Sequence, residues 1–256
     1  MKYVKVLCKD LRPPFQGGEP YEIGVWNHCE NFDTSEKECA PGFYVIPVSE
    51  LIHYHKPWDD TKVVPAEVKG KSKILSASKQ RYEYIKLGNQ LTDEEVKALC
   101  REIEPELGYR LSEALYPVNP LLLPKATVTD ADIELLRKWS NIRDSVVNSI
   151  EDSIEDSVWS SVWDSVRGSV RGSVRGSVRD SILVYVASLF PNIQKWKYTD
   201  HEVGVYPFHP AVDLWHRGLI PVFDGEKWVL LSGEKAEVVW EEPNADWLKA
   251  QKKEGE

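Results

Sequence analysis

The sequence predicts a mixed α+β protein in which three kinds of segment follow one another. We expect a small N-terminal antiparallel α+β head, a central tetrapeptide repeat that forms a long helix or a helical hairpin, and a small C-terminal unit of helix and β-hairpin. Three observations predict this order: short apolar runs punctuated by Pro and Gly over 1–90, a four-residue period over 141–190, and Asp-Gly and Ser-Gly turns between apolar runs in 191–256. Residues 91–140 are predicted to be a helical connector.

Composition limits the classes of protein that fit. The chain has 256 residues, of which 42% are hydrophobic, and no apolar run approaches the ~18 residues of a membrane-spanning helix. The net charge of −9 disfavours non-specific nucleic-acid binding by the chain as a whole. The N-terminus lacks the apolar core of a signal peptide, so we expect a cytoplasmic protein, in the host cytoplasm if it is viral.

The head is predicted from five apolar runs with strand character, separated by turn residues such as Pro13-Pro14 and Gly17-Gly18. The runs are 3–7, 21–26, 42–46, 62–68 and 82–87. Short runs of this kind, close together in the chain, are typical of antiparallel pairing.

Part of the head resembles an uncharacterised domain of phage and microbial proteins. In that family a strand, a Cys and a Gly-Phe-His motif precede a short helix with paired aromatics and a Val-x-x-x-Gly strand. The matching residues here are Cys39, Gly42-Phe43-Tyr44, 51–55 and 64–70. Tyr44 stands where the family carries His, so no role of that His transfers, and the Val-to-Gly spacing differs. The resemblance implies a phage-related protein that continues into low-complexity repeats, and it implies no activity.

The order of elements in the head is also similar to an ADP-ribosyltransferase-type fold. That similarity implies Glu83 as a candidate catalytic residue in a nucleotide-binding head. Glu83 lies between Tyr82 and Tyr84, which is also the solvent-facing position of an alternating strand. No convincing Arg or Ser-Thr-Ser element accompanies it, so an enzyme is the alternative hypothesis rather than the main one.

Helical patterning begins after the head. Thr92 is a predicted N-cap followed by three acidic residues, and Thr129 with Asp132 imitates a capping box. Pro117, Pro120 and Pro124 make the stretch between these helices a connector.

The repeat is the most regular feature of the chain. An apolar β-branched residue recurs at every fourth position, at Ile142, Val146, Ile150, Ile154, Val158, Val162, Val166, Val170, Val174, Val178, Ile182 and Val186. As a helix, this stripe drifts by about 40° per tetrad, and a partner must follow the drift. Gly168, Gly172 and Gly176 count against a helix, so a thin β-solenoid is the alternative.

The charges of the repeat are segregated, which suggests a partner. Acidic residues occupy its early half and Arg its late half. In an antiparallel pair of two copies centred near Ser165, Glu151 would approach Arg179 and Glu155 would approach Arg175, with Trp159 and Trp163 at the pivot. We therefore predict a homo-oligomer formed through Glu151, Glu155, Trp159, Trp163, Arg167, Arg171, Arg175 and Arg179.

Two other interpretations of the repeat stay open. The Arg row with nearby Trp is suitable chemistry for an anionic protein or for nucleic-acid phosphate. A repeat that makes only a solvated spacer is the other.

The C-terminal unit is predicted from a helix at 211–217 and strands at 219–223, 228–231 and 236–240. Its five Trp are expected to form a core. His209, Asp213 and His216 share one helical face and are weak candidates for metal ligands, although no metal site is predicted.

Standard catalytic motifs are absent from the sequence, and no cofactor is predicted. The four Cys have no Cys-x-x-Cys pair and are expected to be reduced and mostly buried. The function that the sequence favours is a non-enzymatic interaction or assembly protein that self-associates through the repeat.

Overall fold

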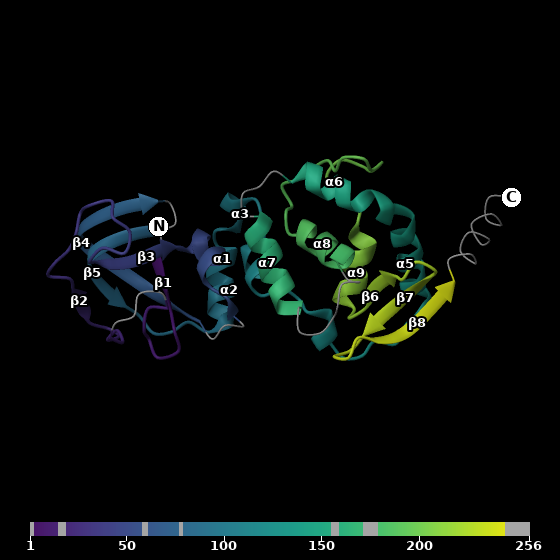
Figure 1. Ribbon diagram of the computed structural model, residues 1–256. Coiled ribbons are helices and arrows are strands. Elements are labelled where there is room, and N and C mark those ends of the chain that lie inside the picture. Colours follow the sequence, from purple (N-terminus) through teal and green to yellow (C-terminus); the bar gives the residue numbers. More distant parts are fainter. Residues whose placement is uncertain are drawn as a thin grey trace. The chain divides into compact units, whose positions relative to one another are not determined.

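The structure is a computed structural model that describes residues 3–14, 19–57, 61–76, 79–154, 159–170 and 179–243 (Figure 1). The chain divides into two compact units, Met1–Tyr116 and Pro117–Glu256. We call them unit 1 and unit 2 and describe each by itself. None of the helices in these described ranges is long and apolar enough to cross a membrane.

Unit 1 is built on a five-stranded antiparallel sheet (Figure 1). Its strands are β1 (Tyr3–Leu7), β2 (Trp26–His28), β3 (Phe43–Pro47), β4 (Lys62–Ser76) and β5 (Lys79–Leu87). Their order in the sheet is β2-β5-β3-β1-β4, and β4 pairs in addition with β5. The pairings of β5, β3, β1 and β4 therefore close into a ring.

The length of β4 makes this closure possible. Its first part pairs with β1, from Leu7↔Lys62 to Tyr3↔Ala66, and its later part pairs with β5. The register with β5 shifts between Lys69 and Ser72, next to Gly70 at φ +80°. Glycine adopts this left-handed conformation at no steric cost, so the strand can bend there. A cluster of buried apolar side chains fills the sheet's inner face: Leu7, Val45, Val64, Ile85 and Leu87.

Short helices complete unit 1. They are α1 (Leu51–Tyr54), α2 (Asp93–Arg101), α3 (Glu104–Leu107) and α4 (Leu111–Leu115), and a 3₁₀ turn, η1 (Val48–Glu50), precedes α1. The predicted N-cap of α2 is confirmed, because Thr92 and Glu95 form a capping box. The α4 helix packs against both α1 and α2.

Unit 2 combines helices with a three-stranded antiparallel sheet (Figure 1). Its elements are η3 (Pro120–Leu122), α5 (Asp130–Ile142), η4 (Arg143–Ser145), α6 (Val146–Ser153), α7 (Trp159–Val170), α8 (Arg179–Ser188), α9 (His209–His216), β6 (Ile220–Phe223), β7 (Lys227–Ser232) and β8 (Glu237–Pro243). The capping box predicted from Thr129 and Asp132 begins α5. The three strands fall on the segments predicted from the turn residues.

The predicted long central helix or helical hairpin is wrong. The described part of the repeat forms three short helices, α6, α7 and α8, and α6 ends where Ile154 adopts an extended conformation. The β-solenoid alternative does not describe these residues either. The drift of a four-residue stripe explains the outcome, since no single straight partner can cover it over fifty residues. Shorter helices turn each part of the stripe inward separately.

Apolar residues of the described part of the repeat are buried in the core of unit 2. Val146, Ile150, Val162 and Val166 are fully buried. The α8 helix is buried over most of its length, from Ser181 to Ala187, and packs against α6, α7, α9 and β6. A helix that is apolar all round belongs in a core, and α8 is the core helix of unit 2.

Tryptophan also serves this core, as the sequence predicts for the C-terminal unit. Trp196, Trp215 and Trp228 are buried, and the Trp215 indole Nε1 donates to Val118 O at 2.8 Å. Trp240 is half-buried, and Trp247 lies outside the described residues.

Candidate functional site

A cavity of about 210 Å³ opens in unit 1 where β1 and β3 separate. We call it the β1–β3 cavity. Most of its lining is apolar and comes from the two strands and from the turn after β1, and its polar groups are two lysines, two tyrosines and a cysteine. The lining residues are Val4, Lys5, Val6, Pro13, Pro14, Cys39, Tyr44, Val45, Ile46, Tyr54 and Lys79.

The register of the sheet explains why the cavity lies here. The two strands form only two residue pairs, Tyr3↔Pro47 and Val4↔Ile46. Beyond Val4, β1 stays paired with β4 as far as Leu7, whereas β3 stays paired with β5 from Val45 back to Phe43. Each strand therefore follows its other neighbour, and a seam opens between them.

The side chain of Lys5 lies at this seam. Its ammonium Nζ donates to the backbone carbonyl of Tyr44 at 2.7 Å and lies 5.0 Å from the centre of the Tyr21 ring. Lys5 is only 7% exposed, and this burial lowers its pKa from 10.5 to about 8. An ammonium has three donors, so one carbonyl leaves part of its hydrogen-bonding capacity for a ligand.

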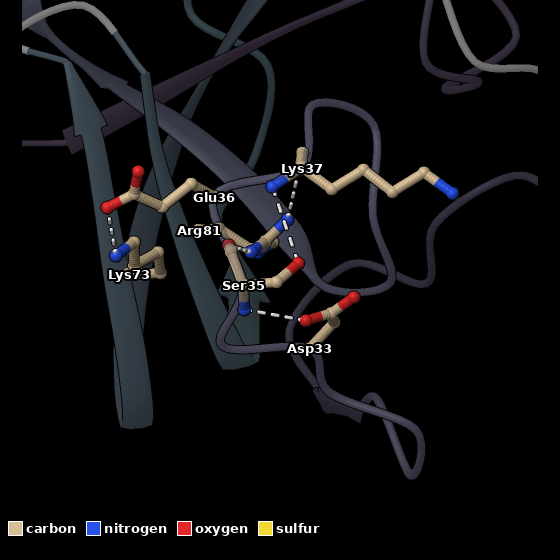
Figure 2. A network of polar contacts seen from close by, with 6 residues as sticks. All are labelled: Asp33, Ser35, Glu36, Lys37, Lys73 and Arg81. Carbon is tan, nitrogen blue, oxygen red and sulfur yellow. Dashed lines mark hydrogen bonds and ion pairs between the residues drawn. The ribbon is translucent and has the colours of Figure 1, made fainter.

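Cys39 also lines the cavity, and Arg81 holds in place the loop before β3 that carries it (Figure 2). The fully buried guanidinium donates to Ser35 O at 2.5 Å, to Lys37 O at 3.1 Å and to the Tyr44 hydroxyl at 2.9 Å. The Tyr44 hydroxyl donates in turn to Ala40 O at 2.9 Å. These bonds fix the loop that carries Cys39 and the ring of Tyr44.

Gly42 is required by this arrangement. Its φ is +144°, and a Cβ added there would lie 2.5 Å from Cγ of Arg81. A side chain at this position would therefore push Arg81 away from the carbonyls that it binds. Figure 2 also shows that the loop is attached to β4 through the ion pair between Glu36 and Lys73, at 3.2 Å.

A second buried polar group in unit 1 is the His55 imidazole. Its two ring nitrogens lie 2.9 Å from the Thr61 hydroxyl and 3.0 Å from the Tyr116 hydroxyl, which donates to Asp93 at 3.2 Å. Burial lowers the pKa of His55 to about 4. Both ring nitrogens already have partners, one from the residue that follows α4 and one from the residue before β4, so this group holds elements together.

The structure places the predicted catalytic candidate Glu83 in a structural contact. Its carboxylate accepts the Lys71 backbone N–H at 3.0 Å, beside the bend at Gly70, and lies 3.7 Å from His28 Nε2. Glu83 is not among the residues that line the β1–β3 cavity. A catalytic role for it stays a prediction.

The weak metal candidates all lie on α9. His209 Nδ1 is 3.2 Å from Tyr206 O, and the His216 ring packs edge-on against Tyr185 at 5.8 Å. Within the described ranges, no group of three or more His, Cys, Asp or Glu side chains could hold a metal ion.

The predicted interaction residues of the repeat are only partly described. Trp159 and Trp163 stack at 6.3 Å on α7 and are half-buried, whereas Arg167 and Arg179 are exposed. Glu155, Arg171, Arg175 and the side chain of Glu151 lie outside the described residues. One ion pair within unit 2 joins the two ends of the repeat in the opposite sense, because the early residue Arg143 is basic and binds the late acidic residue Asp180 at 2.8 Å.

Sequence reasoning missed the β1–β3 cavity. The available signal was Lys5 inside the apolar run Val4-Lys5-Val6-Leu7, since a lysine rarely lies within a central strand without a reason. The cysteines were also predicted poorly. All four are free, as expected, but only Cys100 is buried and Cys39 is exposed.

The fold and this site define an α+β protein with a small apolar cavity that contains a buried amine. Comparison of the chain with protein-family models, with curated proteins and with solved structures finds no match in any of the three.

The first prediction concerns the buried amine of Lys5. The folded pKa of about 8 lies below the ordinary 10.5, so between these values the unfolded chain binds more protons and stability rises with pH. Relative to Lys5→Met, the wild-type free energy of unfolding should rise by up to about 1.4 kcal/mol per pH unit in this window and stay level below it. Urea denaturation of both proteins across the window measures it, and a constant difference would contradict the burial of the amine.

The second prediction concerns the loop held by Arg81. Arg81→Met removes the donors of two backbone carbonyls and of the Tyr44 hydroxyl, so unfolding should become easier by about 3 kcal/mol or more. Trypsin should then cut the native protein after Lys37. Lys73→Met, which removes only a surface ion pair, is the control and should cost about 1 kcal/mol or less. Equal stability and equal cleavage in the two variants would show that Arg81 does not hold the loop.

Proposed function

We propose that unit 1 binds a small molecule with one anionic group and an apolar body in the β1–β3 cavity. The observation that carries the proposal is the buried Lys5 amine, which lines an apolar cavity and has a single carbonyl acceptor. Keeping a lysine in this environment is costly, and such a cost is usually offset by a function or by a partner charge.

The charges around the cavity favour an anion. Lys5 and Lys79 line it, the Lys79 Nζ lies 5.2 Å from the centre of the Tyr44 ring, and the described residues that form the lining include no carboxylate. A bound carboxylate would supply the missing counter-charge to Lys5 in an environment of low dielectric, where such a pair is strong.

The walls favour an apolar body of limited size. Val4, Val6, Ile46 and the two prolines provide aliphatic surface, and Tyr54 provides an aromatic ring. At about 210 Å³ the cavity is smaller than the ~300–1,000 Å³ typical of drug-sized ligands. A small aromatic or branched aliphatic carboxylate fits this description.

A second proposal, self-association through the repeat, keeps one supporting observation. Most of the described residues of the apolar stripe are buried within unit 2, but α7 presents Asp164 and Arg167 to solvent on either side of the predicted pivot, Ser165. In an antiparallel contact between two copies, each Asp164 would approach the Arg167 of the other. This contact is purely polar, so we rank it below the cavity.

The third prediction tests ligand binding. Benzoate and indole-3-acetate should bind the full chain in calorimetry and raise its melting temperature, whereas their neutral amides should bind at least about tenfold more weakly because they lack the charge for Lys5. Lys5→Met should remove most of the preference for carboxylate. Lys125→Met, which removes an exposed lysine of unit 2, is the matched control and should bind as the wild type does. Equal binding of acid and amide would refute the role of Lys5.

The fourth prediction tests self-association. Sedimentation of the full chain should show a dimer that weakens in Asp164→Lys and in Arg167→Glu, because each single reversal places like charges opposite each other. The double variant restores opposite charges and should dimerise again. A monomeric wild type, or a double variant no better than the singles, would refute the contact.

A further inference from the structure

The register of unit 1 places an aromatic and basic row on the outer face of the sheet. In the register of the sheet, Trp26 of β2 lies opposite Lys86 of β5, which lies opposite Glu67 of β4. In the next row of the same face, His28 of β2 lies opposite Tyr84 of β5, which lies opposite Lys69 of β4. Directly paired residues of antiparallel strands point to the same face. Their neighbours Asn27, Ile85 and Val68 point to the opposite face, where Ile85 is fully buried in the core.

These side chains are held in stacked positions. The rings of His28 and Tyr84 are parallel, with 4.3 Å between centroids and 10° between planes. The Lys69 ammonium lies 3.9 Å from the centre of the Trp26 ring and 5.4 Å from that of Tyr84. Trp26 is nevertheless 39% exposed. An exposed Trp that packs into no core has a free face for another flat group. We call Trp26, His28, Tyr84, Lys69 and Lys86 the platform.

The strands that carry the platform are basic in an acidic chain. Residues 62–86 contain seven Lys and Arg against two Glu, a net charge of +5, whereas the whole chain has −9. Arg81 and Lys79 belong to the loop and the cavity described above, but Lys69 and Lys71 are exposed beside the rings. Lys86 forms an ion pair with Glu67 at 3.2 Å and Glu83 lies 3.7 Å from His28, so Lys69 and Lys71 are the exposed cations that this surface offers to an anion.

We infer that the platform binds single-stranded nucleic acid by stacking its bases. Tyr84 is covered by the ring of His28, but Trp26 and His28 are both exposed and lie two residues apart on β2, so two successive unpaired bases can each take one of these rings. The exposed Lys69 and Lys71 would then bind the phosphates. A base pair in a duplex exposes no face for such stacking, so single strands are favoured over duplexes.

This surface differs from the nucleic-acid interface that the Arg row of the repeat suggests. It lies in unit 1, and its aromatic and basic side chains are all described. The net charge of +5 on residues 62–86 also suits a polyanion better than the net charge of −9 on the whole chain. The inference does not depend on the β1–β3 cavity, since none of the platform residues lines that cavity.

The fifth prediction is tested with fluorescently labelled short oligonucleotides and the full chain at low salt. Oligothymidine and oligouridine should bind, quench the Trp fluorescence and bind at least about tenfold more tightly than a duplex of equal length. Trp26→Ala should weaken binding by about tenfold. Lys69→Gln should weaken it and reduce the slope of log affinity against log salt by about 0.7.

Two controls separate binding at the platform from general charge effects and from loss of the fold. Lys125→Gln removes an exposed lysine of unit 2 and should change neither affinity nor salt slope. Melting temperatures of Trp26→Ala and Lys69→Gln should stay near the wild-type value, because both side chains are exposed. Absence of binding by the wild type, unchanged binding by Trp26→Ala, or equal binding of heparin or of an acidic peptide would overturn the inference.

Discussion

The double pairing of β4 is the constraint on which the rest of unit 1 depends. Because β4 pairs with β1 along one part and with β5 along the other, the sheet closes on itself. Within this ring the pairing is shortest between β1 and β3, which form only two residue pairs. The seam creates the cavity, and the ammonium of Lys5 satisfies a carbonyl there. β3 pairs with the first part of one edge of β5, and β2 pairs with the later part of that edge, where it extends the outer face that carries the platform.

Two buried cations of unit 1 show how structure and function can be separated. Arg81 has three acceptors, and its contacts fix one loop, so the fold itself accounts for its burial. Lys5 has one carbonyl acceptor and lines an open volume. The cost of burying a cation falls as more of its donors are satisfied. By this measure Arg81 is a structural residue, whereas Lys5 is the group whose burial a bound anion would explain.

Local signals in the sequence predict local structure well here. The caps at Thr92 and Thr129 and the turn at Asp224-Gly225 act over a few residues, and each lies where predicted. The prediction of one long helix for the repeat was wrong because the regular spacing does not show which elements bury the apolar stripe. Several short helices can bury a drifting stripe better than one straight helix can. The cavity and the platform depend on pairing between distant residues such as Trp26 and Lys86, 60 positions apart. Only the alternations Trp26-x-His28 and Tyr84-x-Lys86 hinted at a shared face.

The two units differ in how many of their apolar and aromatic residues are buried in a core. In unit 2 most of the apolar residues of the described part of the repeat, and most of the C-terminal tryptophans, are buried in one core around α8. In unit 1 the core is smaller, and aromatic and basic side chains remain on an outer face and around a cavity. Residues that stability does not need are those that recognition can use. The proposals for binding therefore rest on unit 1, although the most conspicuous sequence pattern lies in unit 2.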